Sequence, residues 1–297
     1  IASCLVGSEM CIRDREYVYN ENNIDPVLGD QFLSEAYYRA DDDYQGRTTV
    51  PALIDTTTGK VVNNDYNWLT TYFEVNFRPW HKKGAPELYP VELREEIDKM
   101  NLWLFDNINN AVYRSSFSRS NEGHFDGVNT FYAAMDRLEK QLETNRFLFG
   151  DYVTDSDIRL YVTLARLDIR YTAQLGETKR PLYTYKNLWG YAKELWEIPA
   201  FAHHTDFAAI IRQGRIAGEE DGFRASTHYD LALPKIDLDA QWKVSTERAY
   251  LSSDPTHPIY LGNNRRFDID PTWYDLGAES PKKEEKETPP SCGCFCG

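Results

Sequence analysis

From about residue 90 onward, the chain has apolar residues at the three- and four-residue spacing that is typical of amphipathic helices. The first such stretch keeps this spacing over roughly six turns. Its apolar positions are Leu93, Ile97, Met100, Leu104, Ile108 and Ala111. The same pattern recurs further along and predicts helices over residues 90–113, 125–144, 155–173, 188–196 and 202–211. We therefore expect an all-helical domain over residues 86–213.

The pattern differs before residue 80. Two short runs rich in β-forming residues, 52–55 and 61–62, are joined by a Thr-rich turn that ends at Gly59, which predicts a β-hairpin. Pro51 suits the head of a strand, where no ladder hydrogen bond has to be donated. Short helices are predicted over residues 32–40 and 65–73. Strands early in the chain and helices late predict an α+β fold in two domains.

The predicted organisation has five segments. Residues 1–14 show no periodicity, and we interpret them as a non-native stub. Residues 15–78 form the small domain, which starts with an extended segment, and residues 86–213 form the helical domain. Periodicity then fades, so residues 214–280 are expected to wrap over the folded body in extended form. Residues 281–297 combine lysine and glutamate with prolines and are expected to be disordered.

The charge and the cysteines narrow the class of protein. Nucleic acid and anionic lipid surfaces are poor partners for a chain of net charge -14, because both are themselves negative. No apolar run approaches the length of about 18 residues that suggests a membrane span. The five cysteines lie near the ends, at positions 4, 11, 292, 294 and 296. Since a disulfide scaffold would place cysteines through the core, we expect a cytoplasmic protein.

Thr154 and Asp157 form a helix-opening motif, with a hydroxyl at the N-cap and a carboxylate three residues later. Each side chain can bond a backbone N–H group that the first turn leaves unpaired. Val153 and Ile158 supply the flanking apolar pair of such a cap. Losing the cap typically costs about 1 kcal/mol. This position accounts for Asp157, so we interpret it as a structural residue and not as a catalytic acid.

Three blocks of sequence are more specific. They read Gln-Gly-Arg-Thr-Thr-Val-Pro at 45–51, Leu-Tyr-Pro at 88–90 with Asn-Asn-Ala-Val-Tyr at 109–113, and Asp-Ile-Arg-Leu at 157–160 with Arg-Leu-Asp at 166–168 and Tyr171. In this order and spacing they resemble the glutathionyl-hydroquinone reductases, the xi class of glutathione transferases. The resemblance implies a glutathione-transferase-like fold, with a partial thioredoxin-like domain over 15–78 followed by an all-α domain over 86–213.

The resemblance also implies a reaction. In the family, a cysteine thiolate removes glutathione from a glutathionyl-hydroquinone, and a second glutathione resolves the resulting mixed disulfide. That cysteine belongs to a Cys-Pro-Trp-Ala motif, which this sequence does not contain. Cys11 has no Pro-Trp after it, and nothing around it promises the lowered pKa that a reactive thiol needs. We therefore assign no catalytic residue, and expect this chain to be inactive while the catalytic segment is missing.

Two other functions stay open. The first is a non-catalytic binding or assembly module that keeps the glutathione transferase fold and has lost its thiol. The second is a conventional transferase that uses Ser or Tyr, although the helical-domain blocks match the class that uses cysteine. A longer transcript separates enzyme from module, because the enzyme requires a Cys-Pro-Trp segment upstream.

The glutathione side of the site follows from the resemblance. Val50, next to an expected cis-Pro51, matches the residue whose backbone pairs with glutathione as an added strand would. A plain strand-entry proline is the alternative. Asp65 matches the acidic residue that holds the γ-glutamyl end. Tyr66 stands where the family has a serine, and Tyr17 where it has a tryptophan, which puts part of this binding site in question.

The resemblance also implies that two tyrosines, Tyr113 and Tyr171, face the quinol. A phenol at Tyr113 can donate a hydrogen bond to a developing phenolate; the alternative is that Tyr113 only ends a buried helix face. Asp168 is spaced with Tyr161, Leu164 and Tyr171 on a mostly apolar face of the helix predicted over 155–173, and we favour a structural hydrogen bond for it. His203 and His204 point in different directions on a helix, so no metal is expected. Glutathione is the expected co-substrate, quinol conjugates are the expected small-molecule partners, and the family favours a homodimer.

Overall fold

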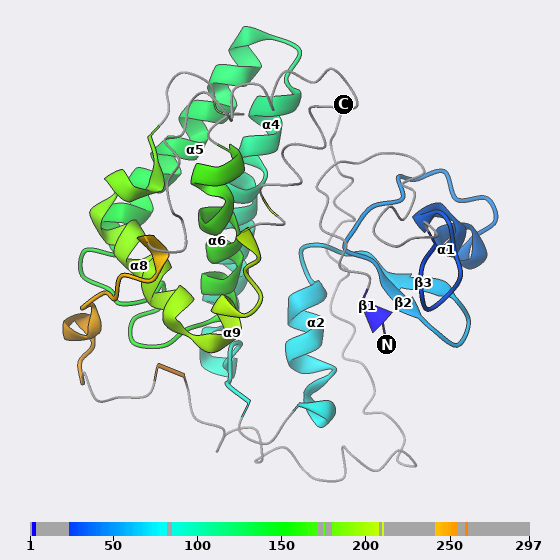
Figure 1. The fold of residues 1–297 in the computed structure, drawn as a ribbon, viewed down its shortest axis with the longest axis horizontal. Coiled ribbons are helices and arrows are strands. Elements are labelled where there is room, and N and C mark those ends of the chain that lie inside the picture. The colour runs from blue at the N-terminus through cyan, green and yellow to red at the C-terminus, as the bar shows by residue number, and fades with distance from the viewer. Residues whose placement is uncertain are drawn as a thin grey trace.

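The computed structural model describes residues 2–3, 24–81, 85–171, 175, 180–207, 210, 241–254 and 259–260. A helical lobe lies beside a smaller lobe that holds the sheet, and helix α2 lies between them (Figure 1). Four of the predicted features fall outside these residues. They are Tyr17 with its extended segment, most of the stub, most of the wrapping segment and the tail at 281–297.

The small lobe is built on the predicted hairpin, which is confirmed. Strand β2 (Leu53–Asp55) pairs antiparallel with β3 (Lys60–Asn63), and β1 (Ala2–Ser3) pairs with the other side of β2. The turn depends on Gly59, whose φ of 69° favours glycine. Helix α1 (Leu33–Ala40) packs on β3.

The helix predicted over 65–73 starts later than expected. Helix α2 runs from Leu69 to Val75 and is followed by a 3-10 turn, η1 (Arg78–Trp80). The residues before it form a turn in which the Asp65 carbonyl accepts hydrogen bonds from the N–H groups of Trp68 and Leu69. The apolar pattern therefore placed a helix where the chain first makes a turn.

The long helix predicted over 90–113 is wrong as one regular element. A 3-10 turn, η2 (Val91–Leu93), leads into α3 (Arg94–Leu104), then a π-helical segment, η3 (Phe105–Asn109), and then α4 (Ala111–Phe117). The Asn110 N–H donates to the Phe105 carbonyl at 2.8 Å, an i to i+5 bond. Tyr113 consequently lies inside a helix and does not end one.

The remaining helices differ from their predicted ranges mainly at the ends. Helix α5 (Asn121–Gln141) starts earlier because Ser120 caps it, accepting from the Gly123 N–H at 3.1 Å. Helix α6 (Asp155–Arg166) continues as a second π segment, η4 (Leu167–Tyr171). Further along the chain come η5 (Leu182–Thr184), α8 (Lys186–Glu197) and α9 (Pro199–Ala202).

The start predicted for the last helix, at residue 202, is wrong. A proline at the first position begins α9 at Pro199, and α9 ends at Ala202. Residues 203–206 follow without α-helical structure, although Phe207 and Ile210 are helical. Apolar spacing did not detect this break, because both flanking pieces are helical.

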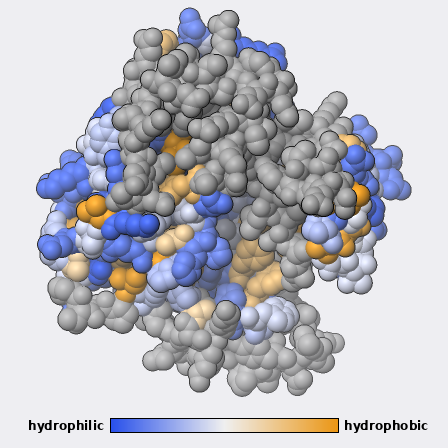
Figure 2. All heavy atoms as spheres, in the orientation of Figure 1, coloured by the Kyte–Doolittle hydropathy of each residue, from blue (hydrophilic) through white to orange (hydrophobic). Residues whose placement is uncertain are grey.

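The main core lies among the helices. Phe131, Met135 and Leu138 of α5, together with Leu160 of α6, are fully buried. On the visible face of the molecule the helical lobe is largely hydrophilic, with apolar side chains in small groups (Figure 2). Within the described ranges, no helix is both long and apolar enough to pass through a bilayer.

Part of the predicted wrapping segment packs on the helical lobe, including the turn η6 (Ala249–Leu251). Trp242 exposes 3% of its surface and meets the ring of Trp189 at 5.0 Å. Arg248 donates to the carbonyl oxygens beyond the C-terminal end of α5, those of Leu142, Asn145 and Arg146, at 3.0–3.2 Å. These residues therefore cover the end of α5.

Candidate functional site

The Val50–Pro51 peptide bond is cis. It lies just before β2, where Val50 packs against the small cluster of buried side chains between α1 and the sheet. The Tyr37 hydroxyl donates to the carbonyl of Thr49 at 2.6 Å and ties the preceding residue to α1. The chain is thus fixed on both sides of the bond that the resemblance assigns to glutathione binding.

Asp65 and Tyr66 lie in the turn before α2. The Asp65 carboxylate accepts from the Asn67 N–H at 3.1 Å, and its own N–H donates to Asn63 Oδ1 at 2.8 Å. Tyr66 is 45% exposed, and its ring meets that of Phe105 at a centroid distance of 5.5 Å. The residue that replaces the family's serine therefore contacts the first π segment of the helical domain, a contact that the sequence did not predict.

The structure brings together the two tyrosines assigned to the quinol side. The hydroxyl oxygens of Tyr113 and Tyr171 are 3.3 Å apart, although 58 positions separate them in sequence. Their rings are nearly perpendicular, with centroids 6.1 Å apart, and Tyr113 also stacks on Phe117. Tyr113 is partly buried and Tyr171 is 4% exposed. This pair presents two phenols at one place between α4 and η4.

Both tyrosines are positioned by π segments. Tyr171 is the last residue of η4, and Tyr113 follows η3 by four residues. In a regular α-helix Tyr113 would lie roughly 80° around the axis from Phe105. A π turn holds more residues than an α turn, which reduces this offset, and such turns are frequent at functional sites. The aromatic contacts of Phe105 and Tyr113 therefore lie closer to one side of the same helix.

Asp168 makes the predicted structural hydrogen bond. Its carboxylate accepts from the Leu182 N–H at 2.6 Å. Burial raises the pKa of Asp168 to about 6, while the N–H groups of Leu182 and Tyr183 act in the opposite direction. Asp168 thus holds the segment before α8 against η4, three residues from Tyr171.

Thr154 and Asp157 form a capping box at the start of α6. The Asp157 carboxylate accepts from the Thr154 N–H at 2.7 Å, the Thr154 hydroxyl at 2.8 Å, the Leu148 N–H at 3.0 Å and the Tyr191 hydroxyl at 2.8 Å. Asp157 is fully buried, and this burial raises its pKa against the effect of the four bonds. All of these partners lie within the helical domain, in keeping with a structural position.

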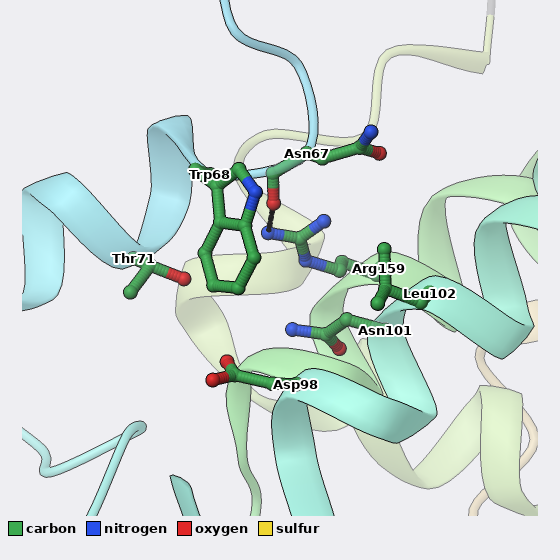
Figure 3. A pocket seen from close by; sticks show the side chains of 7 residues that line it. All are labelled: Asn67, Trp68, Thr71, Asp98, Asn101, Leu102 and Arg159. Carbon is green, nitrogen blue, oxygen red and sulfur yellow. Dashed lines mark hydrogen bonds between the residues drawn. The ribbon is translucent and has the colours of Figure 1, made fainter. Parts of the chain in front are cut away.

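A buried polar network joins α2 to α6, and the sequence did not predict it. Arg159 Nε donates to Asp155 Oδ2 at 2.8 Å. Arg159 Nη2 donates to the Asn67 carbonyl at 2.7 Å, the bond drawn as a dashed line in Figure 3. Asp155 also accepts from Thr70 Oγ1 at 3.2 Å and from Asn101 Nδ2 at 2.8 Å. The only sequence signal is the spacing of Asp155 and Arg159, four residues apart on one helix.

A small polar pocket lies beside this network, between α2, α3 and α6 (Figure 3). It is lined by Asn67, Trp68, Thr71, Asp98, Asn101, Leu102 and Arg159. Within the described part of the chain, Thr71 Oγ1 and Asn67 Oδ1 are buried atoms without a hydrogen-bond partner. The pocket begins two residues after Asp65, so the predicted glutathione side adjoins the contact between the two domains.

Several groups fall outside this description. Tyr17 and all five cysteines, at positions 4, 11, 292, 294 and 296, are not among the described residues. Among the residues that are described, no three His, Cys, Asp or Glu side chains gather closely enough to hold a metal ion. The roles assigned to Val50, Asp65, Tyr66, Tyr113 and Tyr171 remain predictions.

Known proteins resemble this chain in sequence. Residues 111–194, from α4 to α8, match the family described as glutathione S-transferase, C-terminal domain. The glutathionyl-hydroquinone reductase YqjG of Escherichia coli (strain K12) is 33% identical over 186 residues, which cover 63% of this chain and 56% of that protein. The chain thus matches little more than half the length of this curated relative.

Solved structures extend the likeness to the fold. A glutathione transferase from Gordonia bronchialis aligns with a TM-score of 0.70 and 31% identity, covering 82% of this chain and 76% of that one. The xi-class glutathione transferase of Phanerochaete chrysosporium aligns with a TM-score of 0.63 and 31% identity, covering 75% of this chain and 70% of that one. The glutathione-bound structure of YqjG aligns with a TM-score of 0.59 and 33% identity, covering 64% of this chain and 61% of that one. The predicted two-part fold is confirmed, and the chain belongs to the xi class of glutathione transferases, the family of the glutathionyl-hydroquinone reductases.

Proposed function

We propose that this chain supplies the glutathione-binding and quinol-binding parts of a glutathionyl-hydroquinone reductase. The observation that carries the proposal is the meeting of the Tyr113 and Tyr171 hydroxyls. Glutathione would lie along the backbone of Val50, beside the cis bond, with its γ-glutamyl end at Asp65. The ligand in the glutathione-bound structure of YqjG supports this choice of co-substrate.

The two phenols would act on the quinol. A thiolate attacks the sulfur of the conjugate, so the ring carbon–sulfur bond breaks, a disulfide to glutathione forms and a proton replaces sulfur on the ring. A second glutathione then forms glutathione disulfide and frees the thiol. Negative charge that develops on the quinol oxygen is stabilised by a hydrogen bond from Tyr113, which Tyr171 orients.

The attacking thiol would come from a segment beyond this sequence, since no Cys-Pro-Trp-Ala motif is present in it. The purified chain is therefore expected to bind glutathione and a hydroquinone without turnover, as measured by calorimetry and by release of the free quinol. Addition of an upstream segment with Cys-Pro-Trp should restore turnover. Reduction of a glutathionyl-hydroquinone by the present chain with the substitution Cys11→Ser would contradict this proposal.

The tyrosine pair is tested by Tyr113→Phe and Tyr171→Phe. Each variant loses one hydroxyl and is expected to weaken hydroquinone binding by about 2- to 10-fold. Tyr250→Phe is the matched control, because Tyr250 is 70% exposed. Equal hydroquinone affinity in the wild type and in the three variants would mean that the two phenols do not contact the hydroquinone.

A non-catalytic binding or assembly module is the second candidate. Its supporting observation is Tyr66, which replaces the expected serine and contacts Phe105. Glutathione binding without hydroquinone binding, in a full transcript that lacks Cys-Pro-Trp, would favour this module. Assembly as a homodimer is a further prediction, which light scattering of the purified chain tests.

A further inference from the structure

Arg159 links the helical domain to the turn that precedes α2. Its guanidinium has three acceptors: Asp155 Oδ2, the Asn67 carbonyl oxygen and Thr70 Oγ1. Asp155 belongs to α6, whereas Asn67 lies in the turn before α2 and Thr70 lies in the first turn of α2. Arg159 is 9% exposed, so these bonds form largely away from water.

The Asn67 carbonyl, one of these acceptors, lies in the same turn as Asp65. The Asn67 N–H donates to the Asp65 carboxylate, and the Leu69 N–H donates to the Asp65 carbonyl at 2.9 Å. A displacement of the Asn67 carbonyl therefore displaces the residue whose carboxylate is assigned to the glutamyl end of glutathione.

We propose that Arg159 is a positioning residue for glutathione, which fixes the turn of residues 65–68 against the helical domain through the Asn67 carbonyl. The proposal rests on the glutathione site of the proposed function, and it adds a residue that does not itself touch the ligand. It implies that the glutathione side of the site is completed only when α2 is docked on α6.

The position requires a guanidinium. A planar fork donates several hydrogen bonds in fixed directions, whereas the ammonium of lysine is a compact charge on a flexible stem. Asp155 is held in place as the anchor by its own donors, Thr70 and Asn101, and Ser156 donates to the Asn101 amide oxygen at 2.7 Å. A lysine would keep the charge beside Asp155 and lose the simultaneous bond to Asn67.

The test compares Arg159→Lys with Arg78→Lys. Arg78 is the matched control because it is also buried and paired, with Glu87 at 2.8 Å, but it lies beyond the other end of α2. Two quantities are measured well below the unfolding temperature: the dissociation constant for glutathione, and hydrogen exchange of the Asn67, Trp68 and Leu69 amides. Arg159→Lys should raise both the dissociation constant and the exchange rates about tenfold, as expected for loss of a hydrogen bond to a charged group.

The outcomes separate a positioning role from a general loss of stability. Both substitutions should lower the unfolding temperature, but Arg78→Lys should leave glutathione affinity and the three amides unchanged. An Arg159→Lys protein that only melts earlier, with wild-type affinity and exchange, overturns the proposal. So does an equal effect of the control.

Two further measurements keep the test decisive. If Arg159→Lys does not fold, Thr70→Val removes one acceptor of the guanidinium while leaving the charge, and should shift both readouts in the same direction by about 2- to 5-fold. If the wild-type chain does not bind glutathione, the proposed function fails. The exchange rates then decide by themselves whether Arg159 holds the turn.

Discussion

The helical lobe and the small lobe differ in how much apolar surface they bury. In the helical lobe, side chains from α4, α5, α6 and α8 join one large cluster around Phe131. Among the described residues of the small lobe, the buried cluster has five members: Leu33, Ala36, Tyr37, Ala52 and Ile54. Since hydrophobic stabilisation scales with the apolar area removed from water, the helical lobe has most of the folding free energy.

The small lobe compensates with polar links. Arg39 donates to Asp30 and to the Gly59 carbonyl, and Tyr37 holds Thr49. An isolated two-stranded hairpin is only marginally stable in water, and the third strand here, β1, adds only two residues to the sheet. The buried bonds of Arg159 to Asn67 and Thr70 are therefore expected to contribute much of the attachment of the small lobe to the helical lobe. We therefore expect the structure of the predicted glutathione side to depend on packing against the helical lobe, whereas the helical lobe is held by its own core.

The largest effect should come from the centre of the large cluster. Phe131→Ala leaves a cavity in a fully buried site and is expected to lower the free energy of unfolding by about 3–5 kcal/mol. The matched control is Phe125→Ala in the same helix, because Phe125 is 53% exposed and should cost less than about 1 kcal/mol. Urea denaturation followed by circular dichroism measures both. Equal losses would mean that α5 does not hold the core.

A smaller and more local effect is expected in the small lobe. Ile54→Ala removes a side chain that is 3% exposed, and should cost about 2–3 kcal/mol. Because its cluster is separate from the large one, the amides of β2 and β3 should exchange faster while those of α5 stay protected. Hydrogen exchange by mass spectrometry gives this contrast.

Val62→Ala is the control for Ile54→Ala. Val62 lies on β3 but is 59% exposed, so its loss should leave the exchange rates nearly unchanged. If Ile54→Ala unfolds both lobes together, the two clusters act as one cooperative unit and the comparison is wrong.

The sequence predicted regular elements better than the places where they change. The hairpin follows from β-rich runs and a turn with Gly59, and these local preferences survive folding. The π segments did not appear, because each is only five residues long and shifts the apolar stripe too little to break a pattern of three- and four-residue steps. The start of α2 was missed because Asp65 accepts helix-like backbone bonds in a turn that is not yet a helix.

The site was predictable only where a short motif marks it. Tyr113 and Tyr171 were named from the family resemblance, yet their contact depends on two π segments that the pattern did not show. Arg159 donates to the backbone carbonyl of residue 67, which any residue there would supply, and to the Thr70 hydroxyl, which has no recognisable spacing from Arg159 in the sequence. No sequence signature could therefore have shown this contact between domains.

The smallest effect concerns pH, which should act in opposite directions on the two lobes. Burial raises the pKa of Asp168 in the helical lobe from 3.8 to about 6, so the folded state binds this proton more tightly than the unfolded chain. As the pH falls from about 6 to about 4, this group should therefore stabilise the fold. In the small lobe, the hydrogen bond from the Thr57 N–H lowers the pKa of Asp55. Its contribution is present above about pH 4 and is lost as the pH falls further.

Asp168→Asn separates these effects. The amide oxygen can still accept from the Leu182 N–H but carries no charge to desolvate, so the variant should be more stable than wild type at pH 7 by on the order of 1–2 kcal/mol. At pH 5 the wild-type carboxyl is largely protonated, and the difference should shrink. Urea titrations at the two pH values measure it. A variant that is less stable at pH 7, with the pH dependence of wild type, would mean that the ionised carboxylate is stabilised by its partners and that the two lobes respond to acid alike.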